Sequence, residues 1–289
     1  MTVLVTLPLV MSVLLAVTAH RVTRWLPPAV GAWSLAWSAV IVAISTVWSL
    51  SLLVAFLVDD IPHTPLLEQL IPVPDALSVA TIPILIWSGF RVLAALYRRR
   101  QLRAGLAAVV APGDGELIVV REGRPDAFAV AGRPGRIVVT ASMLRALSAP
   151  QRRALLAHER AHLHGRHSRL LAMAQFAAAA NPLLIPVRRA IGYLCERHAD
   201  EQAADATGDR TLVAEALAAA AFAERPVRAL PAPAFHHLGV AARVTALMSP
   251  MRYRSAGLVT AALLALIAFT AACDATDRFY ELLRHALPG

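Results

Sequence analysis

Four stretches of the chain are almost uninterrupted runs of apolar residues, which is the pattern of helices that cross a membrane. Between the third and fourth runs, polar and apolar positions mix with the periods of soluble helices and strands. The first run lacks the basic start and small-residue cleavage site of a signal peptide, so we interpret it as a retained helix. The predicted transmembrane helices cover about residues 2–19, 30–58, 77–97 and 256–273.

Charge in the connecting segments predicts the topology, because Lys and Arg are retained on the cytoplasmic side. Arg21 and Arg24 follow the first run, and four arginines at positions 98–103 follow the third. The segment 59–75 between the second and third runs carries four carboxylates and no Lys or Arg. We therefore expect a multi-pass plasma-membrane protein with its amino terminus outside. Its parts would be three spans in residues 1–97, a cytoplasmic domain at 98–255, the span 256–273 and a short extracytoplasmic tail at 274–289.

Composition supports a membrane protein and argues against two other classes. Apolar residues make up 57% of the chain and charged residues 16%, which is too apolar for a soluble protein of this length. The net charge of +9 could suggest nucleic acid, but the arginines cluster beside apolar runs and no basic motif interleaved with aromatics occurs. Direct nucleic-acid binding is not expected. Cys195 and Cys273 would lie on opposite sides of the membrane, so no disulfide is expected.

The middle segment reads as a small sheet followed by helices. Residues 116–120, 127–131 and 136–140 are short β-prone runs separated by Gly, Pro and Asp, and they predict a small antiparallel sheet. Ser148 to Gln151 form a capping box that starts a helix running to His164. Further helices are expected at about 187–206, 211–224 and 239–248. The predicted fold class is an α+β membrane protein that is mostly helical.

The helix that starts at this capping box carries the H-E-x-x-H pattern of zinc peptidases. His158 and His162 are four residues apart, so both imidazoles can reach one zinc ion from the same face of the helix. Glu159 beside them can act as the general base that takes a proton from water. The competing interpretation is a polar helix face that happens to be rich in histidine, since His164 and His167 follow.

A catalytic zinc site needs a third protein ligand. The metzincin pattern fails, because its third histidine position is occupied by Ser168. Glu196 and Asp200 lie four apart on a second helix; we predict Glu196 as the ligand and Asp200 as the group that orients a ligating histidine. Cys195 is adjacent but points about 100° away, so it is predicted to pack in the core. The competitors that the sequence leaves open are His198, Glu201 and Asp205.

These residues resemble the membrane peptidases of the BlaR/MecR antirepressor type, gluzincins assigned to family fifty-six of the metallopeptidases, with HtpX and the CAAX prenyl proteases as relatives. Three spans before the zinc domain favour BlaR/MecR over HtpX, which would have two. The stretches that carry the resemblance are residues 125–128, 137–140, 155–162, 181–182 and 196–200.

The resemblance implies that His158, His162 and Glu196 bind one zinc ion, that Glu159 is the general base and that the substrate pairs with an edge strand of the sheet. Our candidate for that edge is residues 136–140. The wider group often has Asp where His167 stands, which leaves the role of this residue open.

Related peptidases also carry a His and an Arg near the reaction centre before the last span. In this chain the matching stretch holds His236, His237 and Arg243. His237 is our candidate donor to the oxyanion, and the alternative is a histidine pair in a proline-rich linker.

Together these observations predict an integral membrane zinc endopeptidase with a gluzincin-like cytoplasmic domain. Its expected partners are the lipid bilayer and a protein or peptide substrate, for which a BlaI/MecI-like transcriptional repressor is our candidate. One alternative is an HtpX-like protease for membrane-protein quality control; another is a non-catalytic signalling scaffold with a structural zinc. Recognition of a β-lactam is not expected, because the residues after Cys273 lack S-x-x-K, S-D-N and K-T-G patterns. The oligomeric state and the inducing signal stay open.

Overall fold

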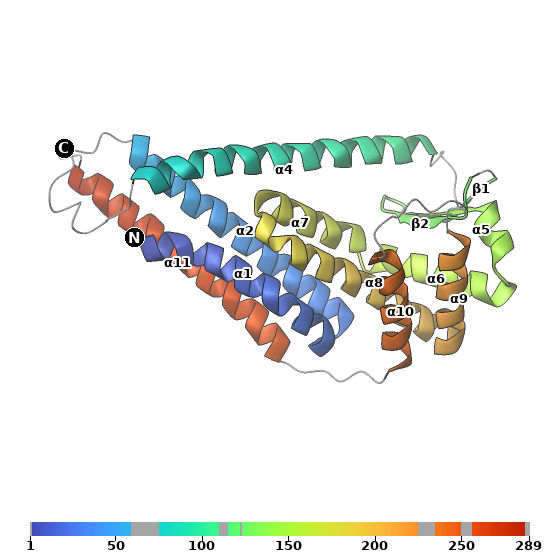
Figure 1. Ribbon diagram of the computed structural model, residues 1–289. Helices are drawn as coiled ribbons and strands as arrows, with labels where there is room; N and C mark the ends of the chain where they lie inside the picture. Colours follow the sequence, from blue (N-terminus) through green and yellow to red (C-terminus); the bar gives the residue numbers. More distant parts are fainter. Residues whose placement is uncertain are drawn as a thin grey trace.

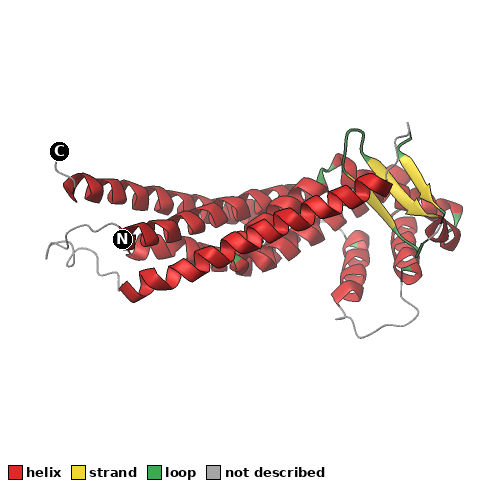
Figure 2. Ribbon diagram, turned by 90° about the horizontal axis from the view of Figure 1, so that it is seen from above, coloured by secondary structure: helices red, strands yellow, loops and turns green. Residues whose placement is uncertain are grey.

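A bundle of long helices and a domain of shorter helices with a small sheet make up the protein (Figures 1 and 2). The computed structural model describes residues 2–58, 75–109, 115–121, 123–224, 235–249 and 256–286. Within these residues, four helices are long and apolar enough to cross a membrane, so the predicted mostly helical α+β membrane fold is confirmed. They are α1 (Thr2–Trp25), α2 (Pro28–Val58), α4 (Asp75–Val109) and α11 (Ala256–Ala286).

The long helices extend beyond the apolar runs. Helix α11 continues through residues that we expected to form a tail, because no Gly or Pro occurs between Cys273 and Ala286 to end it. Helix α4 likewise runs past the predicted end at residue 97 to Val109.

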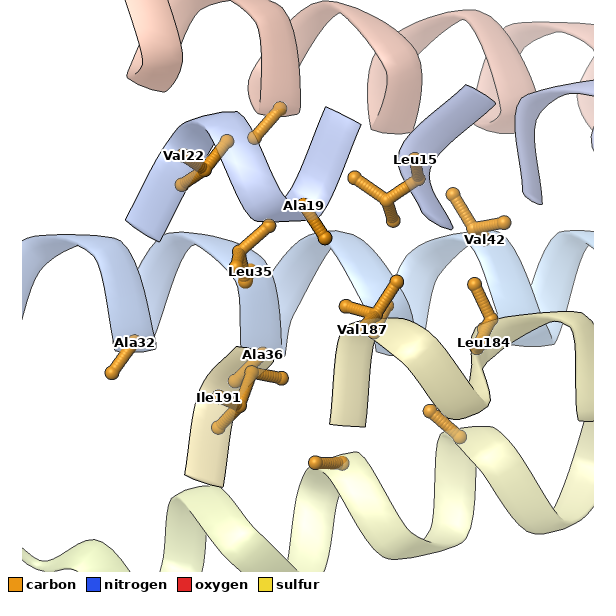
Figure 3. Close-up of a cluster of buried hydrophobic side chains, with 14 of the residues drawn as sticks. Leu15, Ala19, Val22, Ala32, Leu35, Ala36, Val42, Leu184, Val187 and Ile191 are labelled. Atoms are coloured by element: carbon orange, nitrogen blue, oxygen red, sulfur yellow. The ribbon is translucent and has the colours of Figure 1, made fainter. Parts of the chain in front are cut away.

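A helical hairpin from the second half of the chain inserts into this bundle. It comprises α7 (His167–Ala180), which the sequence analysis did not predict, the short η1 (Pro182–Leu184) and α8 (Ile185–Thr207). Val187 and Ile191 of α8 belong to one buried apolar cluster with Leu15 of α1 and Leu35 of α2, and all four are less than 1% exposed (Figure 3). The hairpin is therefore held by burial of apolar side chains of both long helices.

Asn181 at the tip of the hairpin determines how far the hairpin extends along α1 and α2. Its Nδ2 donates to Ser12 Oγ at 2.7 Å and to Thr46 Oγ1 at 3.2 Å, and its Oδ1 accepts from Leu183 N at 3.1 Å. Asn181 is 3% exposed. Buried polar groups are stable only when paired, so this network fixes the position of the hairpin along α1 and α2.

Helix α4 packs along the other side of the hairpin (Figure 1). Arg91, in the middle of this apolar helix, donates from Nη2 to the carbonyl oxygen of Ala178 at 3.0 Å. Ala178 lies in the last turn of α7, where carbonyl groups have no partner within the helix. The contact thus gives a partner to a half-buried charge and to a helix end at once.

The sheet corrects two predictions. Its strands β1 (Leu117–Val120), β2 (Ala127–Val130) and β3 (Arg136–Thr140) lie in the order β1-β3-β2. Strand β2 is antiparallel to β3 but β1 is parallel to it, so the predicted antiparallel sheet is wrong and the sheet is mixed. The predicted edge strand at 136–140 is also wrong. Strand β3 is the most buried of the three, with Ile137, Val138 and Val139 at most 1% exposed, and it takes the centre, where both sides are covered.

Four shorter helices complete the domain: α5 (Ala141–Ala146), α6 (Ala149–His164), α9 (Arg210–Ala223) and α10 (Phe235–Met248). The predicted capping box of α6 is confirmed, since Ser148 N donates to Gln151 Oε1 at 3.0 Å and Gln151 N donates to Ser148 Oγ at 3.5 Å. Helix α6 packs against α8 and α9, with β2 alongside. This packing brings the histidine pair of α6 opposite the carboxylates of α8.

Candidate metal centre

Three ligand atoms from two helices converge on one point. The Nε2 atoms of His158 and His162 on α6 lie 3.2 Å apart. The Glu196 carboxylate on α8 lies 3.7 Å from His158 Nε2 and 3.6 Å from His162 Nε2. Among the described residues, this trio forms the group of His, Cys, Asp and Glu side chains that could hold a metal ion.

The trio fits zinc by distance and by chemistry. Ligands about 2.0–2.2 Å from a tetrahedral ion lie roughly 3.3–3.6 Å from one another, close to the separations found here. Two histidines with one glutamate are also a donor set of catalytic zinc sites, which leave the fourth position open. The three side chains are half-buried, so they face a cavity and not the packed core.

Asp200 and Arg243 form a second layer around these ligands. Asp200 Oδ1 lies 3.0 Å from His158 Nδ1, as expected for a carboxylate that orients the ring. Arg243 of α10 donates to both oxygens of Asp200, at 2.6 and 2.8 Å, and its Nη1 lies 2.9 Å from Glu196 Oε2. One guanidinium therefore holds both carboxylates of α8 in position.

The other ligand histidine is backed by further histidines. His162 Nδ1 lies 2.8 Å from Nδ1 of His167, whose Nε2 lies 2.9 Å from His198 Nδ1. His167 is 1% exposed. If His162 presents a bare Nε2 to a metal, its proton is on Nδ1 and points at His167, so each ring in the chain donates to the next.

Gly165 makes room for this chain of rings. A Cβ atom at position 165 would lie 2.4 Å from His167 Nε2 and 3.0 Å from the Ala161 carbonyl oxygen. The next residue, Arg166, adopts a left-handed conformation with φ of 53°. The tight turn between α6 and α7 thus folds His167 back under His162, and Gly165 leaves the space that this packing needs.

Glu159 lies beside the trio in a buried position, with 7% of its surface exposed. Burial raises the pKa of Glu159 to about 7, although the His158 charge and a hydrogen bond with the Ala129 backbone act in the opposite direction. A carboxylate with a pKa near neutrality can both accept and return a proton, which is the property of a general acid–base group.

The pKa values of the three candidate ligands are shifted in different directions. Burial opposes the charge on His158, but hydrogen bonds to Asp200 and Glu196 outweigh it and raise the pKa of His158 to about 9. Burial, with the His158 charge, lowers the pKa of His162 to about 4. Burial also opposes the Glu196 charge, yet the His158 hydrogen bond and Arg243 lower the pKa of Glu196 to about 2. Without metal, the positive charge in the trio therefore rests on His158.

A cavity of about 720 Å³ opens at the centre and is bordered by the true edge of the sheet. Thr140 N donates to Asp126 O at 3.0 Å, and antiparallel pairing alternates, so the backbone groups of Ala127 and Ala129 point away from β3. Both residues line the cavity. Helix α9 supplies an apolar wall on the cavity that includes Val213, Ala216, Leu217 and Ala220.

The remaining candidates lie elsewhere or outside the described residues. Glu201 pairs with Arg210, and His198 contacts His167, so neither competes with Glu196. Cys195 is fully buried in the bundle core and burial raises its pKa to about 12. His237 belongs to α10, but its side chain and that of His236 lie outside the described residues.

Comparison with known proteins agrees with this geometry. Residues 93–179 match the model of Peptidase family M48. The match includes α6 with His158, Glu159 and His162, and it ends before Glu196. No curated protein and no solved structure matches the chain. Over the segment that carries the histidine pair, the chain is similar to the metallopeptidases of family M48.

Proposed function

We propose that this protein is an integral membrane zinc metalloendopeptidase. The observation that carries the proposal is the convergence of the His158, His162 and Glu196 ligand atoms, with the buried Glu159 beside them. The similarity to family M48 over α6 and the four membrane-length helices support the same conclusion.

Zinc held by this trio would supply Lewis-acid chemistry that polarises a scissile carbonyl group and water. Glu159 takes a proton from the attacking water and returns it to the departing amine, for which its pKa near neutrality is suited. Asp200 keeps the His158 ring in place, and Arg243 balances the charge of the two carboxylates on α8. Residues of α6, α8 and α10 therefore keep the three proposed zinc ligands in one geometry.

The substrate is a polypeptide that binds in extended form. The backbone groups of Ala127 and Ala129 point away from β3, so a peptide can add to the sheet as a fourth strand beside the contact of Ala129 with Glu159. The peptide would then run past Glu159 with its side chains alternately facing the α9 wall. Apolar side chains fit that wall, because Val213 and Leu217 line it.

For the finer function we propose a protease of the plasma membrane whose domain faces the cytoplasm and cleaves a BlaI/MecI-like repressor. The arginines after the third span and the resemblance to the BlaR/MecR type support it. The alternative is an HtpX-like protease for quality control of membrane proteins. Selective cleavage of one repressor supports the first function, and cleavage of many misfolded membrane proteins supports the second.

Glu159→Gln tests the catalytic assignment. This change keeps size and hydrogen bonding but removes the base, so the variant should bind one zinc per chain and lose at least about a hundredfold in peptide cleavage. Glu215→Gln is the control, because Glu215 is exposed on α9 and does not line the cavity. Full activity in Glu159→Gln would refute the assigned base. An inactive wild type that still holds zinc would favour the signalling scaffold.

A further inference from the structure

A second cavity, of about 700 Å³, lies between the end of α1, the first half of α8 and the second half of α10. It shares no lining residue with the cavity at the metal centre. The second cavity lies against α8 and α10, which also contribute to the metal centre. It uses surfaces of these helices that take no part in the proposed reaction.

The lining of this cavity is basic. Helix α1 contributes His20 and Arg24, and α8 contributes Arg189 and Arg197. Hydroxyl groups come from Tyr193, Thr245 and Ser249, and none of its lining residues is Asp or Glu. Arg24 and Arg189 are exposed. Such a cluster of donors without a carboxylate is complementary to an anion.

The position of Arg189 along α1 indicates which kind of anion the cavity can bind. Asn181 contacts Ser12 and Arg197 Nη1 donates to the Thr23 carbonyl at 3.1 Å, so α8 runs in the same direction as α1. Arg189 lies halfway between Asn181 and Arg197, level with about residues 17 and 18 of α1. This level is inside the membrane-length segment Thr6–Trp25, where an exposed arginine is costly unless it reaches an interfacial phosphate or water.

The cavity also has an apolar part. Ala16 and Ala19 line it from α1, and Ala190 and Ala242 line it from α8 and α10. Small side chains leave space for an occupant to lie along α1. An inorganic phosphate ion would use the arginines alone, whereas a molecule with an anionic head and an apolar chain matches both parts.

We propose that this cavity binds an anionic phospholipid, with its phosphate between Arg24, Arg189 and Arg197 and an acyl chain along Ala16 and Ala19. Basic pockets between transmembrane helices at the membrane surface are suited to such headgroups. The bound lipid bridges α1 to α8 and α10. Because Glu196 precedes Arg197 and Arg243 follows Ala242, the lipid also braces the helices behind the metal centre.

Native mass spectrometry of the full chain in detergent tests the proposal, using phosphatidylglycerol and phosphatidylcholine with the same acyl chains. The double variant Arg24→Gln/Arg189→Gln removes two charges from the cavity. The matched control is Arg21→Gln/Arg188→Gln, which removes two charges one to three residues away on the same helices. Neither control residue lines the cavity, and Arg188 Nη1 donates to Gln175 Oε1 at 2.7 Å.

We expect wild type and control to bind phosphatidylglycerol at least about tenfold more tightly than the cavity variant does, with phosphatidylcholine binding equal in all three. Ala242→Phe, which fills the cavity at an exposed position and leaves every arginine intact, should lose phosphatidylglycerol as well. Equal losses in the cavity variant and the control would refute the site, as would a wild type that binds inorganic phosphate as tightly as the lipid. These readouts do not depend on peptidase activity.

Discussion

The Nδ1 atoms of His162 and His167 lie 2.8 Å apart, so a neutral imidazole backs one ligand while the carboxylate of Asp200 backs the other. A carboxylate beside a ligating histidine raises its basicity, and a second imidazole does so less. The two ligand histidines therefore differ electronically, although they lie on the same face of one helix. Burial and the neighbouring His162 lower the pKa of His167 to about 3, which keeps this supporting ring neutral.

Replacing His167 should weaken metal binding. His167→Phe keeps a ring of similar size but cannot accept the His162 proton, so the zinc affinity should fall about tenfold or more. Competition with a chelating dye measures it. His164→Phe, on the exposed side of the same turn, is the control and should keep the wild-type affinity. Equal affinities in the two variants would contradict the supporting role of His167.

Gly165 should tolerate no side chain. Gly165→Ala places a methyl group 2.4 Å from the buried His167 ring, so we expect a loss of about 1–3 kcal/mol in stability and lower zinc affinity. Gly192→Ala is the matched change, because its nearest neighbour would be Leu171 Cδ2 at 4.0 Å. Thermal unfolding in detergent compares the two. A Gly165→Ala protein as stable as Gly192→Ala would disprove the steric argument.

Zinc affinity should rise with pH between about 7 and 9. The pKa of His158 is raised to about 9, so the metal-free protein carries a proton that zinc must displace. The same shift gives the metal-free protein a stability contribution that is complete below about pH 6.5 and is lost as the pH rises through 9. Calorimetry in buffers of different ionisation enthalpy measures the released proton. An affinity that is constant over this range would show that His158 is neutral before zinc binds.

The exposed edge of β2 should matter for the substrate. Ala129→Pro removes the backbone N–H that hydrogen-bonds to Glu159 and blocks pairing along this edge, where proline leaves the sheet intact. Cleavage should fall at least about tenfold while the zinc content stays at the wild-type value. Ala129→Gly, which changes the same position but keeps the N–H, should remain active. Equal activity in both variants would place the substrate elsewhere.

Local signals in the sequence predicted the parts of the fold that depend on neighbours in the chain. The apolar runs predicted four membrane-length helices, and Ser148 with Gln151 predicted the start of α6. The spacing of His158 and His162 indicated a shared face, and the spacing of Glu196 and Asp200 a second one. The structure brings these two faces together.

Long-range pairing could not be predicted in the same way. Strand order depends on which strand is buried from both sides, and the sequence does not show that the short connection before β2 crosses over β3. The alanine-rich α7 has no distinct polar face, because it is buried between α2, α4 and α8. The contact of His167 on α7 with His198 on α8 joins residues 31 positions apart, and the H-G-R-H stretch was the only local feature of the sequence that marked it.

Zinc content measured together with cleavage tests the central claim most directly. Elemental analysis of the detergent-purified wild type should give about one zinc per chain, and His158→Ala should lose both the zinc and the cleavage of a candidate repressor or an unstructured polypeptide. His164→Ala, six residues further along α6 and exposed, should keep the zinc. A wild type without zinc, or a His158→Ala variant that retains zinc and activity, would contradict the proposed metal centre.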